Sequence, residues 1–116
     1  MNLNNFVQLV GHYGETPVNK GNDESKPFTS FSFATNNTFK DATGQRVERV
    51  SWHNCVAYGN IAQSLIKHQA KGDKALIHGA LQYRTYENKE GKTIYVTEII
   101  VDSVQFLTAK NTDNAN

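Results

Sequence analysis

Four aromatic side chains occupy positions that suit a binding surface better than a core. Phe39 follows a polar Asn-Asn-Thr run and precedes Lys40, and Tyr86 stands between a threonine and a glutamate. Trp52 and Tyr58 fall on one face of a predicted strand, because side chains alternate along a strand. Flat aromatic faces beside cations are what sequence-tolerant binding of a single nucleic-acid strand requires. Each ring taken alone is as well explained by core packing, but together they favour a binding surface.

Basic residues gather in the same part of the chain. Residues 40–92 hold nine Lys and Arg against five Asp and Glu, a net charge of +4, whereas the flanks sum to −3 and the whole chain to +1. Arg84 shares a face with Tyr86, two residues away. Lys40 and Arg49 lie in the same stretch and are included in the predicted contacts to a single nucleic-acid strand. Charge alone would also fit an ordinary solvated surface.

The sequence does not predict an enzyme. Cys55, the only cysteine, lies in an apolar stretch and is predicted to be a small core residue. A nearby histidine, His53, is not enough to predict a catalytic thiol. The four histidines lack paired ligand spacing, and no phosphate loop or dinucleotide fingerprint is present. No catalytic residue, metal or cofactor is therefore predicted.

Length and hydropathy limit the architecture. The 116 residues suit one domain with a modest core. No stretch approaches the roughly 18 to 20 apolar residues of a membrane span, and the N-terminus lacks the pattern of a signal peptide. We expect a soluble, cytoplasmic (nucleoid-associated) protein with no membrane partner.

Period-two patterns predict strands on both sides of one helix. Three strands are predicted first: the apolar run at 6–10, the alternation at 28–35 and the long segment 47–58. Loops are predicted at 14–27, at 36–37 and at 41–45. Phe31 and Phe33 are assigned to the core, as is Phe106. Strands over 74–86 and 93–101 follow, with a bend at Gly79 and a short edge piece at 104–107.

The single helix is predicted between Asn60 as N-cap and Gly72 as C′ residue. Three strands, a helix and two strands are the order of a five-stranded OB-fold β-barrel, an all-β fold with one helix between strands 3 and 4. The predicted organisation is a single OB-fold domain over 1–107, followed by a short disordered polar tail over 108–116.

The order of several short motifs is similar to that of the bacterial single-stranded DNA-binding protein (SSB) family. The matching segments cover residues 3–107 and are Asn5-Phe6-Val7-Gln8-Leu9-Val10-Gly11, Phe33-Ala34-Thr35, Ser51-Trp52-His53-Asn54, Lys71-Gly72-Asp73, Gly79-Ala80-Leu81, Arg84-Thr85-Tyr86 and Tyr95-Val96-Thr97-Glu98-Ile99.

This resemblance implies a homotetramer that binds single-stranded DNA in replication, recombination and repair. The family's base-stacking positions correspond to Phe39, Trp52, Tyr58 and Tyr86, and its basic contacts to Arg84 and Lys71. His53 corresponds to a histidine near the subunit interface. Many relatives carry Trp where this chain has Phe39 and Tyr86.

The sequence also departs from the family pattern. Asn54, Asn60 and Gln82 stand where relatives often have Arg or Lys, so fewer phosphate contacts and a shallower salt dependence are expected. The chain ends without an acidic, aromatic tip, which makes recruitment of replication and repair proteins doubtful. Two alternatives stay open: an OB-fold module for protein interaction or assembly with weak nucleic-acid binding, and a preference for RNA.

Overall fold

The computed structural model describes residues 3–108, which form five strands and one helix in the order β1, β2, β3, α1, β4, β5. The elements are β1 (Val7–Tyr13), β2 (Phe28–Lys40), β3 (Arg46–Tyr58), α1 (Gly59–His68), β4 (Lys74–Glu87) and β5 (Thr93–Phe106). The strands close into a barrel in the order β1-β2-β3-β5-β4. The predicted five-stranded barrel with a helix between its third and fourth strands is confirmed.

Alternating side chains fill the barrel. Phe31 and Phe33 of β2 are 3% and 0% exposed, as predicted, and Tyr13 and Ile77 join them in one core cluster. Cys55 is buried in the same cluster, which confirms its assignment as a core residue. Leu65 brings the apolar side of α1 against this core.

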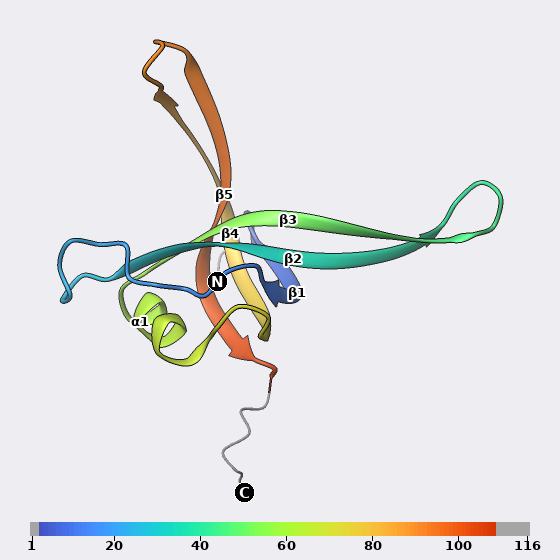
Figure 1. Cartoon of the computed structure of the whole chain (residues 1–116), viewed down its shortest axis with the longest axis horizontal. Helices are drawn as coiled ribbons and strands as arrows, with labels where there is room; N and C mark the ends of the chain where they lie inside the picture. The colour runs from blue at the N-terminus through green and yellow to red at the C-terminus, as the bar shows by residue number, and fades with distance from the viewer. Residues whose placement is uncertain (1–2, 109–116) are drawn as a thin grey trace, which may run out of the picture.

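Two hairpins extend beyond the barrel as arms. We define the β2–β3 arm as residues 35–51 and the β4–β5 arm as residues 82–98, the stretches in which each strand pairs only with its hairpin partner. Figure 1 shows the two arms leaving the barrel in different directions. These arms carry several of the predicted site residues.

The same turn closes both arms. At one tip Asp41 Oδ1 accepts hydrogen bonds from the backbone N–H groups of Thr43 and Gln45, and at the other Asn88 Oδ1 accepts from those of Glu90 and Lys92. Gly44 and Gly91 then take φ values of 84° and 80°, which glycine adopts without steric strain. A side-chain acceptor followed three residues later by glycine therefore fixes each tip.

Several predicted boundaries are wrong. The helix begins at Gly59 after Tyr58 as N-cap and ends at His68 with Gln69 as C-cap, so Asn60 and Gly72 do not cap it. The predicted loop at 36–37 belongs to β2, and the piece at 104–107 is mostly the end of one continuous β5. A register shift between His78 and Gly79 confirms the predicted bend.

Phe106 is 39% exposed and packs beside His68 instead of in the core. The end of β5, where Phe106 pairs with Ala75, lies at the rim of the barrel, and there the alternation no longer separates interior from exterior. The predicted tail over 108–116 lies, apart from Thr108, outside the described residues.

Candidate nucleic-acid interface

Trp52 and Tyr58 lie on the outer face of β3. They are 63% and 54% exposed, whereas the alternate residues Cys55 and Ala57 are buried. The Trp52 ring packs over Gly14, and the residue opposite it on β2 is the small Ala34. Tyr58 stacks on Phe28 across the ladder, with centroids 6.0 Å apart and planes 24° apart. Both rings therefore keep a flat face open to solvent.

Phe39 lies near the tip of the β2–β3 arm, 40% exposed. The guanidinium carbon of Arg49 lies 5.1 Å from the centre of its ring, a cation–π contact across the hairpin. Lys40 and Arg46 form a cross-strand pair beside it, and both line a cleft of about 340 Å³ with Phe39. One ring and three cations are thus gathered at this tip, and sequence alone did not show that Arg46 belongs with them.

Tyr86 and Arg84 share a face of the β4–β5 arm. Tyr86 is 49% exposed, and the Arg84 guanidinium carbon lies 5.9 Å from its ring centre. Arg84 Nε also donates to Oε1 of the buried Glu98 at 3.1 Å, and the Gln82 amide donates to the same oxygen at 3.3 Å. Because Nε is held by the carboxylate, the terminal nitrogens of the guanidinium remain available to a phosphate.

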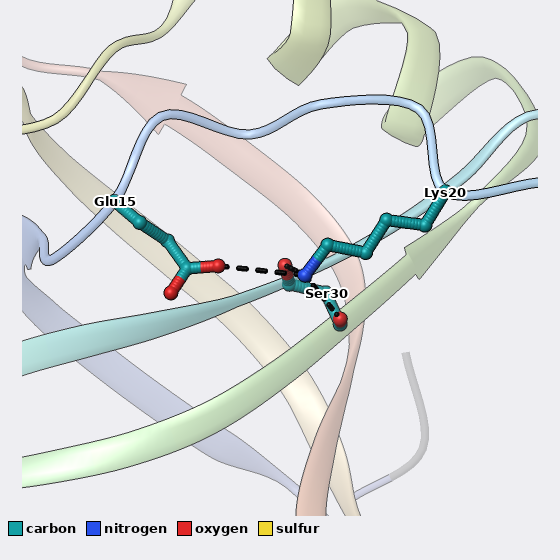
Figure 2. A network of polar contacts seen from close by, with 3 residues as sticks. All are labelled: Glu15, Lys20 and Ser30. Atoms are coloured by element: carbon teal, nitrogen blue, oxygen red, sulfur yellow. Dashed lines mark hydrogen bonds and ion pairs between the residues drawn. The ribbon is translucent and has the colours of Figure 1, made fainter.

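A polar cleft of about 350 Å³ lies between β2, β3 and β5. Arg84, Glu98 and Asn54 line one side, and Lys20, Glu15 and Ser30 line the other. Figure 2 shows Lys20 Nζ donating to the backbone oxygen and Oγ of Ser30, at 2.8 and 2.9 Å, and reaching Glu15 at 3.4 Å. Asn54 and Glu98 also line a smaller cleft beneath Trp52, so the two clefts adjoin.

Lys20 and Glu98 also belong to this region, although the sequence did not predict them there. Lys20 lies in a polar loop where nothing distinguishes it from its neighbours. Glu98 gave a weak signal, since it is a carboxylate directly before the apolar run Ile99-Ile100-Val101 in the middle of β5. A buried charge in such a strand needs a partner, and Arg84 on the paired strand supplies it.

Two predicted residues stand apart from these clusters. Lys71 lies in the turn between α1 and β4, where its backbone N–H donates to Thr16 Oγ1, and its side chain lines none of the clefts described above. His53 points to the inner face of β3, where its Nε2 lies 3.0 Å from Thr35 Oγ1. Burial lowers the pKa of His53. The ring lines a cleft with β1 residues Gln8, Leu9 and Val10.

The chemistry of the described residues suits binding. Burial raises the pKa of the Cys55 thiol to about 12, so this thiol is a poor nucleophile. Within residues 3–108 the structure contains no cluster of three or more His, Cys, Asp or Glu side chains that could hold a metal ion. In the same range, no helix has the length and apolar character needed to cross a membrane. Exposed aromatic rings next to arginines suit a single nucleic-acid strand, because bases stack on the rings and the arginines neutralise phosphates.

Comparison with known proteins agrees with this geometry. The Single-strand binding protein family matches residues 4–107. Single-stranded DNA-binding protein 1 of Staphylococcus aureus (strain MSSA476) is 40% identical over 110 residues, which are 95% of this chain and 69% of that protein. Single-stranded DNA-binding protein 1 of Chlorobaculum tepidum is 37% identical over 108 residues, 92% of this chain and 67% of that protein.

Solved structures show the same architecture. The Plasmodium falciparum SSB complex with ssDNA superimposes with a TM-score of 0.81 at 28% identity, covering 93% of this chain and 97% of that chain. The single-stranded DNA binding protein from Thermus aquaticus, in a deletion mutant, superimposes with a TM-score of 0.78 at 22% identity, over 91% of this chain and 51% of that chain. The second match concerns the fold alone.

Proposed function

This chain belongs to the single-strand binding protein family, and we infer that it binds single-stranded DNA without sequence preference, in replication, recombination and repair. We propose that bases stack on Phe39, Trp52, Tyr58 and Tyr86, while Arg84, Arg49, Lys40 and Lys71 contact the backbone. The observation that carries this proposal is exposure. All four rings are 40–63% exposed, on the barrel and its two arms, whereas Phe31 and Phe33 are buried.

Stacking supplies most of the affinity in this proposal. A net charge of +1 gives little long-range attraction to phosphate. Base–aromatic stacking contributes about 1 to 3 kcal/mol per base, so four rings in each subunit compensate for a sparse set of cations. The protein acts by binding and protecting the strand, without catalysis, in the cytoplasm.

The proposed assembly is a homotetramer with His53 near a subunit interface. The cleft that contains His53 supports this idea, because it opens beside β1 residues with exposed side chains such as Val10, which is 44% exposed. A second subunit would cover the exposed Val10 side chain beside this mostly polar cleft.

A fluorescence titration tests the function. Trp52 is the only tryptophan, so quenching of its emission by oligo(dT) reports stacking at this ring. We expect strong quenching and tight binding that high salt weakens only in part. Replacing oligo(dT) by oligo(U) in the same titration measures any preference for RNA. No quenching together with no mobility shift would leave the protein-interaction module as the better hypothesis.

Variants locate the site. Trp52→Ala, followed with a labelled oligonucleotide, is expected to bind about fivefold or more weakly while keeping its thermal stability, because the ring is exposed. Val50→Ala is the matched control, since Val50 lies on the same face of β3 and is 52% exposed but offers no ring. Equal affinity of a folded Trp52→Ala protein and the Val50→Ala control would remove Trp52 from the site.

A further inference from the structure

Tyr83 and Tyr95 are the most exposed aromatic side chains among the described residues. They are 72% and 81% exposed, more than any of the four rings assigned above. The core cluster does not include them, and the structure gives neither ring a stacking partner within residues 3–108. Tyrosine rings that are this exposed to solvent on a pair of strands are typical of a binding surface.

The two tyrosines share one face of the β4–β5 arm. Tyr83 pairs with Thr97 and Thr85 pairs with Tyr95, so the tyrosines are diagonal neighbours across the ladder. Arg84 and Tyr86 alternate with them along β4 and therefore lie on the opposite face. The arm, which stands clear of the barrel in Figure 1, thus carries exposed rings on both faces.

The face with Tyr83 and Tyr95 is continuous with Trp52. Leu81 precedes Tyr83 by two residues on this face and is 39% exposed, and Thr97 lies directly opposite Tyr83. Leu81 and Thr97 both line the small cleft, about 170 Å³, whose other wall includes Trp52. A strand stacked on Trp52 therefore reaches Tyr83 and Tyr95 by crossing this cleft.

We propose that Tyr83 and Tyr95 form a further base-stacking platform for single-stranded DNA. The proposal rests on the proposed function and extends it to the second face of the arm. Bases are the favoured occupant because the face is continuous with Trp52, and because a π-face accepts any base without hydrogen-bond readout.

Affinity measurements test the platform directly. The double variant Tyr83→Ala/Tyr95→Ala is expected to bind long oligo(dT) at least about fivefold more weakly, while saturating oligo(dT) still quenches Trp52. Tyr83→Phe/Tyr95→Phe keeps the rings and is expected to bind like the unaltered protein. Thr85→Ala/Thr93→Ala is the matched control, since both residues are exposed on the same face of the arm and line none of the clefts described above.

Chemical modification of the unaltered protein provides a second measurement that needs no variant. Tyrosine nitration mapped by mass spectrometry is expected to modify Tyr83 and Tyr95 readily in the free protein and slowly with oligo(dT) bound. Equal rates with and without oligo(dT), in a protein whose Trp52 is quenched, would overturn the proposal. So would slow nitration of the free protein, which would assign these rings to a contact between copies of the chain.

Failure of the platform and failure of the proposed function are distinguishable. If the unaltered protein binds no oligo(dT), the proposed function itself is wrong and the platform with it. If the unaltered protein binds and the tyrosine-to-alanine variant binds equally well, only the platform is wrong. A change of oligomeric state in that variant with unchanged affinity, measured by sedimentation, also overturns the platform.

Discussion

The ring of Trp52 occupies the space that a side chain at Gly14 would need. A Cβ built on Gly14 would lie 2.5 Å from Cζ3 of the indole and would also overlap Ser32 Oγ. Gly14 thus leaves the space that the Cζ3–Cη2 side of the indole occupies, while the Trp52 residue stays 63% exposed. The relationship joins the loop after β1 to the middle of β3.

Gly14→Ala is expected to displace the Trp52 ring and to leave the barrel folded. The ring is 63% exposed and can swing outward, so the free energy of unfolding should change by no more than about 1 kcal/mol. Oligo(dT) affinity should fall several-fold and the Trp52 emission of the free protein should shift. Spectra, thermal melts and titrations measure the three effects.

Gly11→Ala is the informative contrast for that experiment. A Cβ at Gly11 would overlap the backbone oxygen of Ala34, which cannot move aside as an indole ring can. We expect Gly11→Ala to be strongly destabilised. Unchanged emission and affinity in Gly14→Ala would show that the position of the Trp52 ring does not depend on the space left by Gly14.

Because Arg84 pairs with Glu98, we expect Arg84→Ala to lower both the free energy of unfolding and the salt dependence of oligo(dT) affinity. Arg84→Ala leaves the Glu98 carboxylate, 7% exposed, with only the Gln82 amide as a donor. Because Arg84 itself is half exposed, water screens the pair and the expected loss is only about 1 kcal/mol. The slope of log affinity against log salt should become shallower by about 0.7 if Arg84 neutralises one phosphate.

Two further variants give that experiment its controls. Arg84→Ala/Glu98→Ala removes the carboxylate as well and is expected to be no less stable than Arg84→Ala in chemical denaturation. Lys67→Ala removes a cation from the last turn of α1, away from the clefts, and should leave the salt slope unchanged. A slope that is the same in Arg84→Ala and Lys67→Ala would exclude a phosphate contact by Arg84.

Sequence reasoning recovered the barrel because its strands obey a simple alternation. Phe31 and Phe33 recur at period two, and both are core residues. The same alternation placed Trp52 and Tyr58 on one face, and both are exposed. It does not decide the environment of Tyr83, since the inward face of Ile77 and Gly79 continues along β4 past the end of the barrel. Where the barrel ends is set by strand pairing, which one strand's sequence does not reveal.

The helix boundary shows a second limit of local reasoning. Asparagine is a favoured N-cap, so Asn60 was the natural choice. In the structure β3 runs to Tyr58, and the Gly59 N–H donates to the backbone oxygen of Pro27, 3.0 Å away. This tertiary hydrogen bond and the φ of +63° at Gly59 start the helix earlier. The contacts of Glu98 and Lys20 were missed for the same reason, because each joins two different elements: Glu98 contacts Arg84 of β4, and Lys20 contacts Ser30 of β2.

Cys55 is expected to resist thiol reagents in the native protein. The side chain is 1% exposed and its pKa is raised to about 12, so the reactive thiolate is scarce near pH 8. A colorimetric disulfide reagent should label it slowly in buffer and completely in denaturant. Val50→Cys adds an exposed thiol on the same strand and should react at once with one equivalent. Rapid labelling of native Cys55 would contradict the burial described above.

His53 is expected to make stability fall at mildly acidic pH. Burial lowers its pKa in the folded protein, so the unfolded chain binds the proton more readily, and the free energy of unfolding decreases as pH drops below the ordinary value of about 6.5. The decrease continues until the pH passes the lower folded pKa.

His53→Gln keeps a hydrogen-bonding group near Thr35 and does not titrate, so its unfolding free energy should fall less between pH 7.5 and 5.5. His12→Gln, at an exposed position on β1, is the matched control. Chemical denaturation across this range measures all three proteins, and parallel curves for the unaltered protein and His53→Gln would show that His53 does not contribute.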